Sequence, residues 1–311
     1  MCALFGFLDY GQNVPLRVLQ KLLQALANAS EVRGNHASGI AYVKDGNLTI
    51  YKRPKPAHKM HFRLPPGTKA VMGHTRFTTQ GSEKCNFNNH PFRGYAGTDF
   101  ALAHNGVLYN DKELRITESL PITPIETDSY IAVQLLEKFG SLDFDSLRKT
   151  AELVRGGFTF TLLDQEGNLY FIKGESPLHL IHFPSLGLYV YASTAAIMQE
   201  ALEKSPLLCI EHQVINITEG DILKISSNGT VSTASFQMPT YMLPRRAWFS
   251  ASMHEADEDD AFEELLELCG YFGLCEEDVI YLRECGYSYD EIEEFMWNPR
   301  LFEQEIMCEE L

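Results

Sequence analysis

The second residue of the chain, Cys2, carries the side chain best suited to do chemistry. It follows Met1 and precedes the small residue Ala3, a start from which the initiator methionine is readily removed. Removal would place a thiol and a free α-amine on one residue. An α-amine titrates at about 7.7–8.0 and a free thiol at about 8.5, so the amine can take the proton of the thiol near neutral pH. Cys2 is therefore predicted to be a nucleophile that supplies its own base.

Three further motifs supply groups that a reaction at a carbonyl carbon needs. Arg76 ends an apolar segment, and its guanidinium can bind a carboxylate through two parallel hydrogen bonds. Asn105 and Gly106 follow a second apolar segment, and together they offer a side-chain amide and a backbone N–H to an oxyanion. Asp128 begins an amphipathic segment and can receive an ammonium group. Singly, these motifs also fit a surface arginine, an Asn-Gly turn and a helix-capping aspartate.

The segments that must position these groups are short strands with a few helices between them. Apolar spacing predicts helices over 16–29, 127–139 and 193–204. Strands in series with helices interspersed favour a layered α+β fold over alternating βαβ units. The strands predicted from apolar runs and turn signals span 4–8, 39–43, 48–51, 70–77, 100–103, 158–163, 169–172, 178–183, 188–192, 222–225 and 231–236.

The overall composition is that of a globular protein without membrane spans. Of the 311 residues, 45% are hydrophobic and 22% are charged, and no apolar run approaches the length of a transmembrane helix. The N-terminus shows no signal peptide. The seven cysteines are an odd number without a C-x-x-C pair, which favours reduced thiols in a cytoplasmic protein and argues against structural zinc. No metal, nucleotide or flavin motif is present, so we expect no cofactor.

Acidic charge is concentrated in the C-terminal residues. Residues 254–311 contain 20 Asp and Glu against 2 Lys and Arg, a balance of −18, whereas residues 1–253 have a balance of +2. Residues 239–253 have the composition of a linker. Apolar spacing within the acidic part predicts three short helices, and hence a small acidic helical module rather than disorder. Such a charge repels nucleic acid and anionic membranes and suits a basic protein partner.

Taken together, the motifs resemble the class II glutamine amidotransferase domain, a branch of the N-terminal-nucleophile hydrolases. That family includes the glutaminase halves of glucosamine-6-phosphate synthase, phosphoribosyl-pyrophosphate amidotransferase and asparagine synthetase. The resemblance implies a four-layer αββα sandwich over residues 2–238, followed by the linker 239–253 and the acidic helical module 254–311. The segments that carry it are Met1-Cys2, 33–40, 73–81, 88–92, 104–106 and 126–128.

The resemblance also implies a role for single residues. Cys2 matches the nucleophile that forms a γ-glutamyl thioester, and Asn105 with the Gly106 N–H matches the oxyanion hole. Asp128 matches the acceptor of the substrate α-ammonium. No metal or cofactor is implied. The remaining matches are Arg76 for the α-carboxylate, Phe77 and Thr79 beside it, His90 in the substrate pocket, and Arg33 in support of the nucleophile loop.

The activity implied by the resemblance is hydrolysis of the glutamine side-chain amide to glutamate and ammonia. The chain has no room for a sugar-phosphate isomerase or phosphoribosyl domain, so we expect a stand-alone enzyme whose ammonia goes to an acceptor on a separate partner protein. Neither nucleic acid nor a membrane is an expected partner. Two alternatives stay open: a hydrolase of another γ-glutamyl or amide bond, and a non-catalytic regulatory module that acts through the acidic tail.

Overall fold

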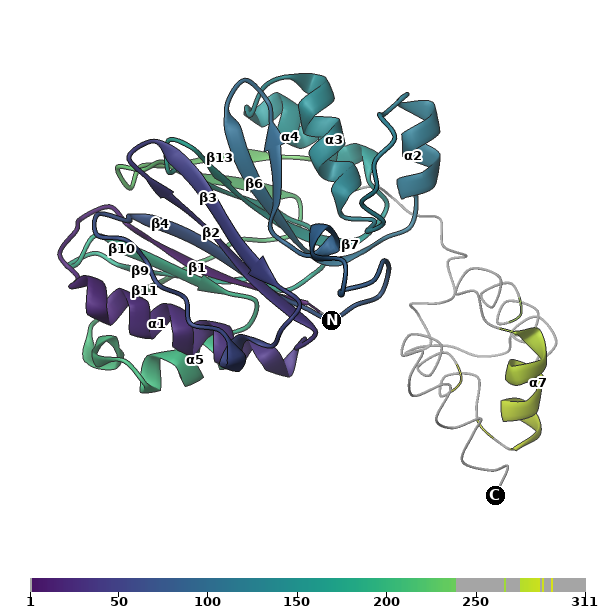
Figure 1. The fold of residues 1–311 in the computed structure, drawn as a ribbon, viewed down its shortest axis with the longest axis horizontal. Coiled ribbons are helices and arrows are strands. Elements are labelled where there is room, and N and C mark those ends of the chain that lie inside the picture. The colour runs from purple at the N-terminus through teal and green to yellow at the C-terminus, as the bar shows by residue number, and fades with distance from the viewer. Residues whose placement is uncertain (1, 239–265, 267–274, 286, 288–291, 293–311) are drawn as a thin grey trace, which may run out of the picture. The chain divides into compact units, whose positions relative to one another are not determined.

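The computed structural model describes residues 2–238, 266, 275–285, 287 and 292 (Figure 1). The chain divides into two compact units, Met1–Thr240 and Tyr241–Leu311. In the second unit the helix α7 (Glu276–Glu284) is described, and it buries Val279 and Leu282 as the apolar spacing predicts. The linker predicted at 239–253 and the other two helices predicted in the acidic residues lie outside the described residues.

The strands of the first unit form two antiparallel sheets. The first sheet has seven strands and the second has six. Across the first sheet the order is β11 (Gln213–Ile215), β9 (His179–Phe183), β10 (Leu188–Ala192), β1 (Ala3–Asp9), β4 (Ala70–Arg76), β2 (Ala37–Lys44) and β3 (Asn47–Arg53). Across the second it is β13 (Val231–Ser235), β12 (Asp221–Ile225), β8 (Leu169–Lys173), β7 (Gly156–Asp164), β6 (Asp99–Leu108) and β5 (Phe92–Tyr95).

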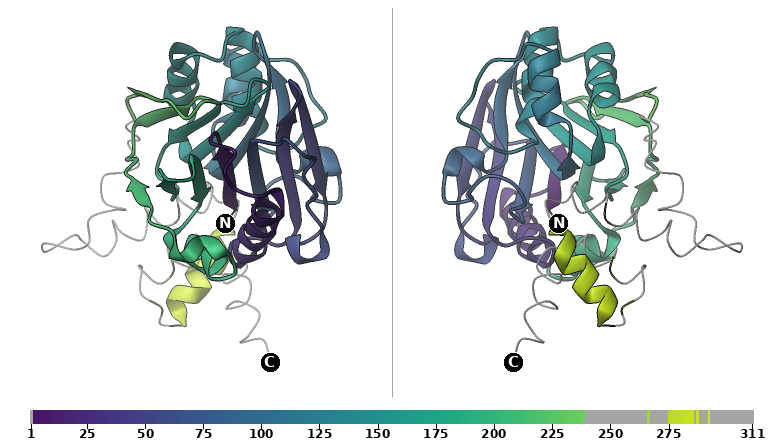
Figure 2. Two further views of the ribbon diagram at one scale, coloured as in Figure 1. Left: turned by 90° about the vertical axis from the view of Figure 1, so that its left-hand side faces the viewer. Right: turned by 90° about the vertical axis from the view of Figure 1, so that its right-hand side faces the viewer.

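Helices cover the outer face of each sheet, which produces four layers (Figures 1 and 2). On the first sheet lie α1 (Leu16–Ala29) and α5 (Ala195–Glu203), whose apolar side chains share one core cluster with that sheet. On the second lie α3 (Tyr130–Phe139) and α4 (Phe144–Leu153), with α2 (Asp111–Thr117) beside α3. The expected αββα sandwich is therefore confirmed.

The central strand β1 is apolar on both faces, and this lets it join the layers. Phe5 and Phe7 pack in the cluster that includes α1, whereas Leu4 and Leu8 pack between the two sheets. All four side chains are fully buried. Because successive side chains of a strand point to opposite faces, Cys2 shares the inter-sheet face with Leu4. The strand therefore fixes the direction of the predicted nucleophile.

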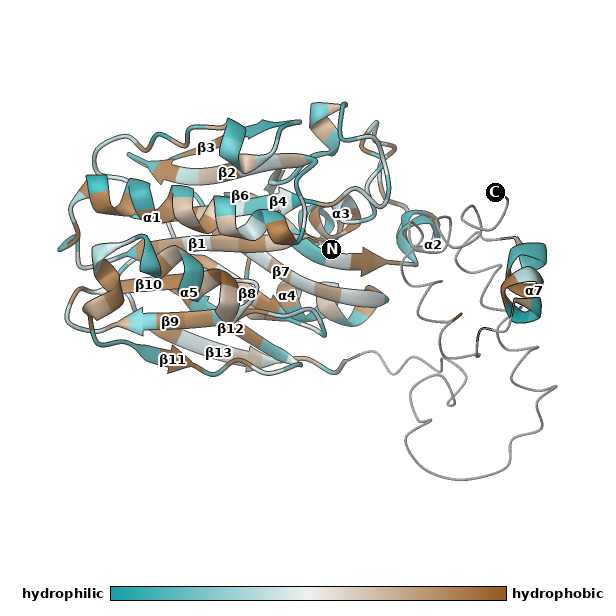
Figure 3. Cartoon of the chain, turned by 90° about the horizontal axis from the view of Figure 1, so that it is seen from below, coloured by the Kyte–Doolittle hydropathy of each residue, from teal (hydrophilic) through white to brown (hydrophobic). Residues whose placement is uncertain are grey.

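Helix α1 has the bounds that apolar spacing predicts, Leu16–Ala29. Leu19, Leu22, Leu23 and Leu26 are buried against the sheet, and bands of opposite hydropathy alternate along the helix in Figure 3. A helix with apolar residues along one face is stabilised chiefly by the tertiary contacts of that face.

The helix predicted over 127–139 begins three residues later, at Tyr130. The preceding residues form a turn, because the side chains of Asp128 and Ser129 bond to β6 residues and to each other. No helix in the described part of the chain has the length and apolar character needed to cross a bilayer.

Strand β1 ends at a residue with a buried carboxyl group, Asp9. Asp9 is 3% exposed, and its Oδ1 accepts the backbone N–H of Gln12 at 2.9 Å. Burial raises the pKa of Asp9 to about 6, against about 3.9 for an unfolded aspartate. Between these values the native state holds a proton that the unfolded state has lost. Stability therefore falls as the pH rises through this window.

We expect Asp9→Asn to stabilise the protein above this window. Asparagine keeps an oxygen that can accept the Gln12 N–H, and it removes the cost of ionising a buried carboxyl, about 2–3 kcal/mol for such a pKa difference. Unfolding of the full chain at about pH 8 and about pH 4 measures the effect. The gain should be present at the higher pH and absent at the lower one. An equal gain at both pH values would contradict the assignment.

Candidate active site

Cys2 lies beside the C-terminal end of β4, where the register of the two strands places it next to Arg76. Its thiol donates a hydrogen bond to the carbonyl of Phe77, with 3.5 Å between Sγ and the oxygen. Its own backbone carbonyl accepts a hydrogen bond from Nε of Arg33 at 2.9 Å. The structure therefore brings the predicted supporting arginine to the predicted nucleophile.

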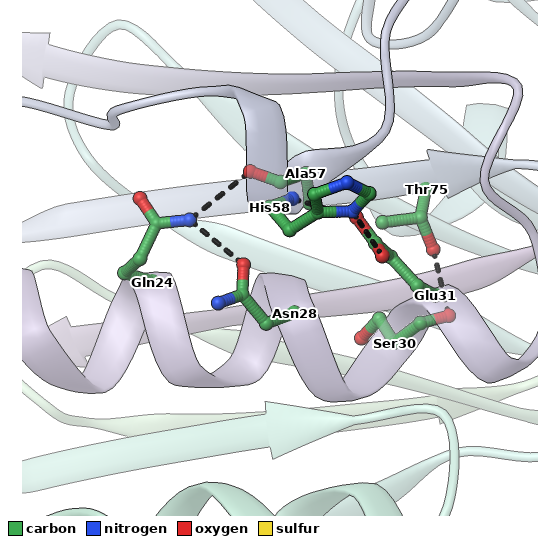
Figure 4. Close-up of polar contacts among 7 residues, drawn as sticks. All are labelled: Gln24, Asn28, Ser30, Glu31, Ala57, His58 and Thr75. Atoms are coloured by element: carbon green, nitrogen blue, oxygen red, sulfur yellow. Dashed lines mark hydrogen bonds and ion pairs between the residues drawn. The ribbon is translucent and has the colours of Figure 1, made fainter.

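The turn before Arg33 is tied to its surroundings by hydrogen bonds at Ser30 and Glu31 (Figure 4). After α1 the chain makes a single 3-10 turn, Ser30–Val32, which ends at Arg33. Oγ1 of Thr75 donates to the first carbonyl of this turn at 3.0 Å, and the backbone N–H of His58 donates to the Glu31 carboxylate at 2.7 Å. These bonds hold the turn against β4, within reach of the first residues of β1.

Strand alternation directs three predicted groups into the space between the sheets. On β6, Ala103 belongs to the apolar cluster between the sheets, so Asn105 points the same way. On β4, Met72 belongs to that cluster, so Arg76 shares its face. Cys2 directly precedes β1 and is two residues from Leu4, which belongs to the same cluster. The three side chains therefore enter the inter-sheet layer from β6, from β4 and from the residue before β1.

Asn105 is fully buried, yet neither polar atom of its side chain has a hydrogen-bond partner in the part of the chain that the structure describes. An unpaired buried amide costs roughly 1–3 kcal/mol. The next residue, Gly106, has a φ of +137°, and a Cβ there would lie 1.8 Å from the carbonyl oxygen of Gly157. Only glycine fits this backbone. The amide and the adjoining N–H are suited to bind a ligand oxygen.

The guanidinium of Arg76 is buried, with 2% of the residue exposed. Nη1 donates to Oδ1 of Asn89 at 2.7 Å, and Nη2 donates to the carbonyls of Gln80 and Gly81 at 2.5 and 2.8 Å. Burial lowers the pKa of Arg76, and the charges of Cys2 and Asp128 raise it. These acceptors are neutral, so a further anion is electrostatically favourable beside this desolvated cation.

The opposite charge comes from Asp128, which is 4% exposed. Oδ2 accepts the backbone N–H of Leu108 at 2.6 Å, and Oδ1 accepts the hydroxyl of Ser129 at 3.3 Å. Burial raises the pKa of Asp128, while these hydrogen bonds and the charge of Arg76 lower it. The charge of Asp128 raises the pKa of the Cys2 thiol, and the charge of Arg76 lowers it. A carboxylate and an ammonium on one small molecule would be complementary to this pair.

Desolvation raises the pKa of the Cys2 thiol above its ordinary value. The hydrogen bond to Phe77 and the charge of Arg76 offset part of this effect. The thiol is therefore protonated near neutral pH, and it needs a base to become a nucleophile.

The other predicted residues lie around this centre. Phe77 is half-buried and Thr79 is exposed in the loop that follows β4. His90 is buried, with its ring centroid 4.2 Å from that of His74 and 4.4 Å from that of Phe92. Burial lowers the pKa of His90 well below its usual value, and neither ring nitrogen has a hydrogen-bond partner among the described residues. His90 is thus a neutral imidazole in the interior.

Three buried polar residues, His74, His104 and Ser129, were not predicted from the sequence to be site residues. Nε2 of His74 lies 2.9 Å from the carbonyl oxygen of His104, and Nδ1 of His104 lies 2.8 Å from Oγ of Ser129. Each of the three stands within two positions of a predicted site residue. The sequence signal that could have identified them is a polar residue within an otherwise apolar strand, or at the start of a helix.

No group of three or more His, Cys, Asp and Glu side chains among the described residues could hold a metal ion. Cys2, Cys85, Cys209 and Cys275 are free thiols in the described part of the chain.

Several known proteins are similar to this chain in sequence. A glutamine–fructose-6-phosphate aminotransferase of Staphylococcus aureus is 30% identical over 246 residues, which are 74% of this chain and 38% of the relative. The enzyme of that name from Geobacillus kaustophilus is 29% identical over 244 residues, which are 75% of this chain and 37% of the relative. This chain is a homologue of the class II glutamine amidotransferase domain. It spans less than two fifths of the length of these two relatives.

A solved structure shows the same fold as the amidotransferase domain. Glutamine phosphoribosylpyrophosphate amidotransferase from B. subtilis aligns with a TM-score of 0.58 and 20% identity, over 76% of this chain and 50% of that one. The two proteins therefore share a fold. No protein-family model matches the chain.

Gly106 and Gly157 allow a matched test of the site backbone. We expect Gly106→Ala to destabilise the amidotransferase domain by at least about 2 kcal/mol, because a Cβ meets a carbonyl oxygen and the backbone is strained. In Gly157→Ala the nearest atom to the new Cβ is Oε2 of Glu175, at 3.7 Å. That variant should unfold close to the original protein. Equal unfolding temperatures for the two variants would contradict the close approach at Gly106.

Proposed function

We propose that the amidotransferase domain, residues 2–238, hydrolyses the side-chain amide of glutamine. The observation that carries this proposal is the buried pair of Arg76 and Asp128 near the Cys2 thiol, with the unpaired amide of Asn105 facing the same layer. A free amino acid presents a carboxylate and an ammonium to such a pair, and its side-chain amide presents a carbonyl to the thiol. The names of the relatives, which are glutamine–fructose-6-phosphate aminotransferases, agree with this substrate.

The reaction begins with activation of the thiol. In the chain as translated the nitrogen of Cys2 is in a peptide bond, so Met1 must be removed to free the amine. With a pKa of about 8, the amine accepts the thiol proton, and sulfur attacks the amide carbon. Arg33 holds the carbonyl of Cys2 by a hydrogen bond and thereby supports the nucleophile.

Attack of sulfur places negative charge on the amide oxygen. The Nδ2–H of Asn105 and the backbone N–H of Gly106 would donate hydrogen bonds to that oxyanion. Both groups are fixed before the reaction by β6, so little reorganisation is needed when the charge appears. A donor of this kind contributes about 10²–10³ to kcat in other enzymes.

Collapse of the tetrahedral intermediate breaks the carbon–nitrogen bond. The Cys2 ammonium returns its proton to the departing nitrogen, which leaves as ammonia, and a γ-glutamyl thioester remains. Water then attacks the thioester with the amine as base, and glutamate leaves as the thiol recovers its proton. The net reaction consumes glutamine and water and yields glutamate and ammonia.

Substrate binding would depend on the charged pair. Arg76 binds the α-carboxylate, with Phe77 and Thr79 beside it in the loop, and Asp128 accepts the α-ammonium. His90 contributes a neutral imidazole to the interior of the pocket. We propose no metal and no cofactor, since thioester chemistry requires neither.

The fate of the ammonia is a further part of the proposal. The relatives are named for transfer to fructose 6-phosphate, and more than three fifths of their length lies beyond the match. We propose that this chain supplies ammonia to an acceptor on a separate partner protein. The charge of the acidic residues 254–311 suits a basic partner. Free thiols at Cys2, Cys85, Cys209 and Cys275 suit a cytoplasmic location.

Release of glutamate from glutamine by the purified full chain tests the proposal. We expect Cys2→Ser to lower kcat at least about 10³-fold, because the nucleophile is lost, and Asn105→Ala to lower it about 10²-fold with little change in KM. Cys85→Ser, which alters an exposed thiol, serves as the control and should retain full activity.

Two outcomes would contradict the proposal. Hydrolysis of γ-glutamyl peptides without any hydrolysis of glutamine would favour a hydrolase of another γ-glutamyl bond. A Cys2→Ser protein that keeps its activity would exclude Cys2 as the nucleophile.

A further inference from the structure

Buried hydrogen bonds run from β4 to the carboxylate of Asp128. Nε2 of His74 lies 2.9 Å from the carbonyl oxygen of His104, Nδ1 of His104 lies 2.8 Å from Oγ of Ser129, and that Oγ lies 3.3 Å from Oδ1 of Asp128. None of the four residues is more than 4% exposed. The contacts connect both sheets with the start of α3.

The groups at the two ends of this series of hydrogen bonds determine which atom is the donor in each bond. A carbonyl oxygen only accepts, so His74 carries its proton on Nε2. An ionised carboxylate also only accepts, so the Ser129 hydroxyl donates to Asp128. Because the Ser129 hydroxyl uses its proton in the bond to Asp128, its contact with His104 must be a hydrogen bond from the Nδ1–H of His104 to the hydroxyl oxygen. Burial lowers the pKa of each of these two histidines to about 3, which keeps both imidazoles neutral near neutral pH.

Ser129 precedes the first residue of α3, where a serine side chain usually caps the helix by accepting a backbone N–H. The structure shows no side-chain cap at this position. By contrast, Asp143 and Thr194, which precede α4 and α5, do accept backbone N–H groups with their side chains. The Ser129 hydroxyl thus donates a hydrogen bond to the Asp128 carboxylate and does not cap α3.

The ionisation of Asp128 depends on groups from several elements. The Leu108 N–H of β6 favours the charged form, as do the backbone N–H and the hydroxyl of Ser129 and the charge of Arg76 on β4. Burial favours the neutral form. The thiol of Cys2, just before β1, and the carboxyl of Asp111 in α2 also interact with Asp128, and a negative charge on either would disfavour its ionisation.

We propose that Ser129 and His104 are positioning residues that keep the Asp128 carboxylate ionised and aimed at the substrate α-ammonium. The site thereby selects amides that carry a free α-amino group. His104 orients the Ser129 hydroxyl by donating a hydrogen bond to its oxygen, and the hydroxyl in turn donates a hydrogen bond to Asp128. The carbonyl that His74 holds belongs to the peptide group before Asn105, so the same series ties the oxyanion residue to the ammonium site. The selectivity part rests on the proposed glutaminase function.

The test compares glutamine with glutaramic acid, the same amide without the α-amino group. We expect Ser129→Ala to raise KM for glutamine about tenfold with kcat within about twofold, because one hydrogen bond to a charged group is lost. The kcat/KM for glutaramic acid should stay unchanged, so the preference for glutamine falls about tenfold. Ser129→Thr keeps the hydroxyl and should restore the preference.

The same comparison has a pH signature. Without the Ser129 hydroxyl, the pKa of Asp128 rises, and its carboxylate takes up a proton at a higher pH. The KM defect for glutamine in Ser129→Ala should therefore grow as the pH is lowered from about 8 to about 6. His104→Phe should show the same pattern in weaker form, whereas His104→Asn, which retains an N–H donor, should lie closer to the original protein.

Ser146→Ala is the matched control. It removes a buried hydroxyl from α4, where its partner is the hydroxyl of Ser141, and it should leave the preference for glutamine unchanged. Thermal unfolding of each variant checks that the proteins are folded.

Carbon NMR titration of the Asp128 carboxyl gives a readout that does not require turnover. A higher pKa in Ser129→Ala than in the original protein supports the proposal, and an unchanged pKa overturns it. An equal loss of activity on glutamine and glutaramic acid also overturns it, because the effect would not involve the α-amino group. If the original protein released no glutamate, the proposed function would fail, while the titration would still decide whether Ser129 keeps Asp128 ionised.

Discussion

Burial of two opposite charges, Arg76 and Asp128, is the constraint on which the rest of the site depends. Taking such groups out of water costs several kcal/mol for each ion unless hydrogen bonds and the opposite charge compensate. The compensation here comes from separate parts of the chain. The carbonyls of residues 80 and 81 and the side chain of Asn89 hold Arg76, and the Leu108 N–H and the Ser129 hydroxyl hold Asp128. The loop after β4, the end of β6 and the start of α3 are thereby fixed around one centre.

The sandwich gives this centre its reactive groups through strand alternation. The period of two that buries Leu4 between the sheets also turns Cys2 into the inter-sheet layer, and on β6 it does the same for Asn105. Burial disfavours ionisation of the thiol, and the Asn105 side-chain amide has no hydrogen-bond partner among the described residues. A substrate carbonyl bound beside the amide would supply that partner and place its carbon near the sulfur.

Much of this arrangement follows from the sequence, because it rests on local patterns. The bounds of α1 follow from apolar spacing alone, and the fold follows from the resemblance of the motifs. Strands β5 and β11 were not predicted. β11 is three residues long and largely exposed, and β5 contains Gly94, where a Cβ would lie 2.4 Å from the ring of Phe100. The links from His74 and His104 to Ser129 and Asp128 also could not be predicted, since they join residues about 25 to 30 positions apart through pairing that only the folded sheets create.

The central claim is that Cys2, with its own α-amine as base, is the nucleophile of a glutaminase. Mass spectrometry of the purified full chain after treatment with a diazo-ketone analogue of glutamine tests it most directly. We expect Met1 to be absent and one equivalent of label to be attached to Cys2, with protection by glutamine. A chain that retains Met1 and resists the label, or that carries the label on another cysteine, would contradict it.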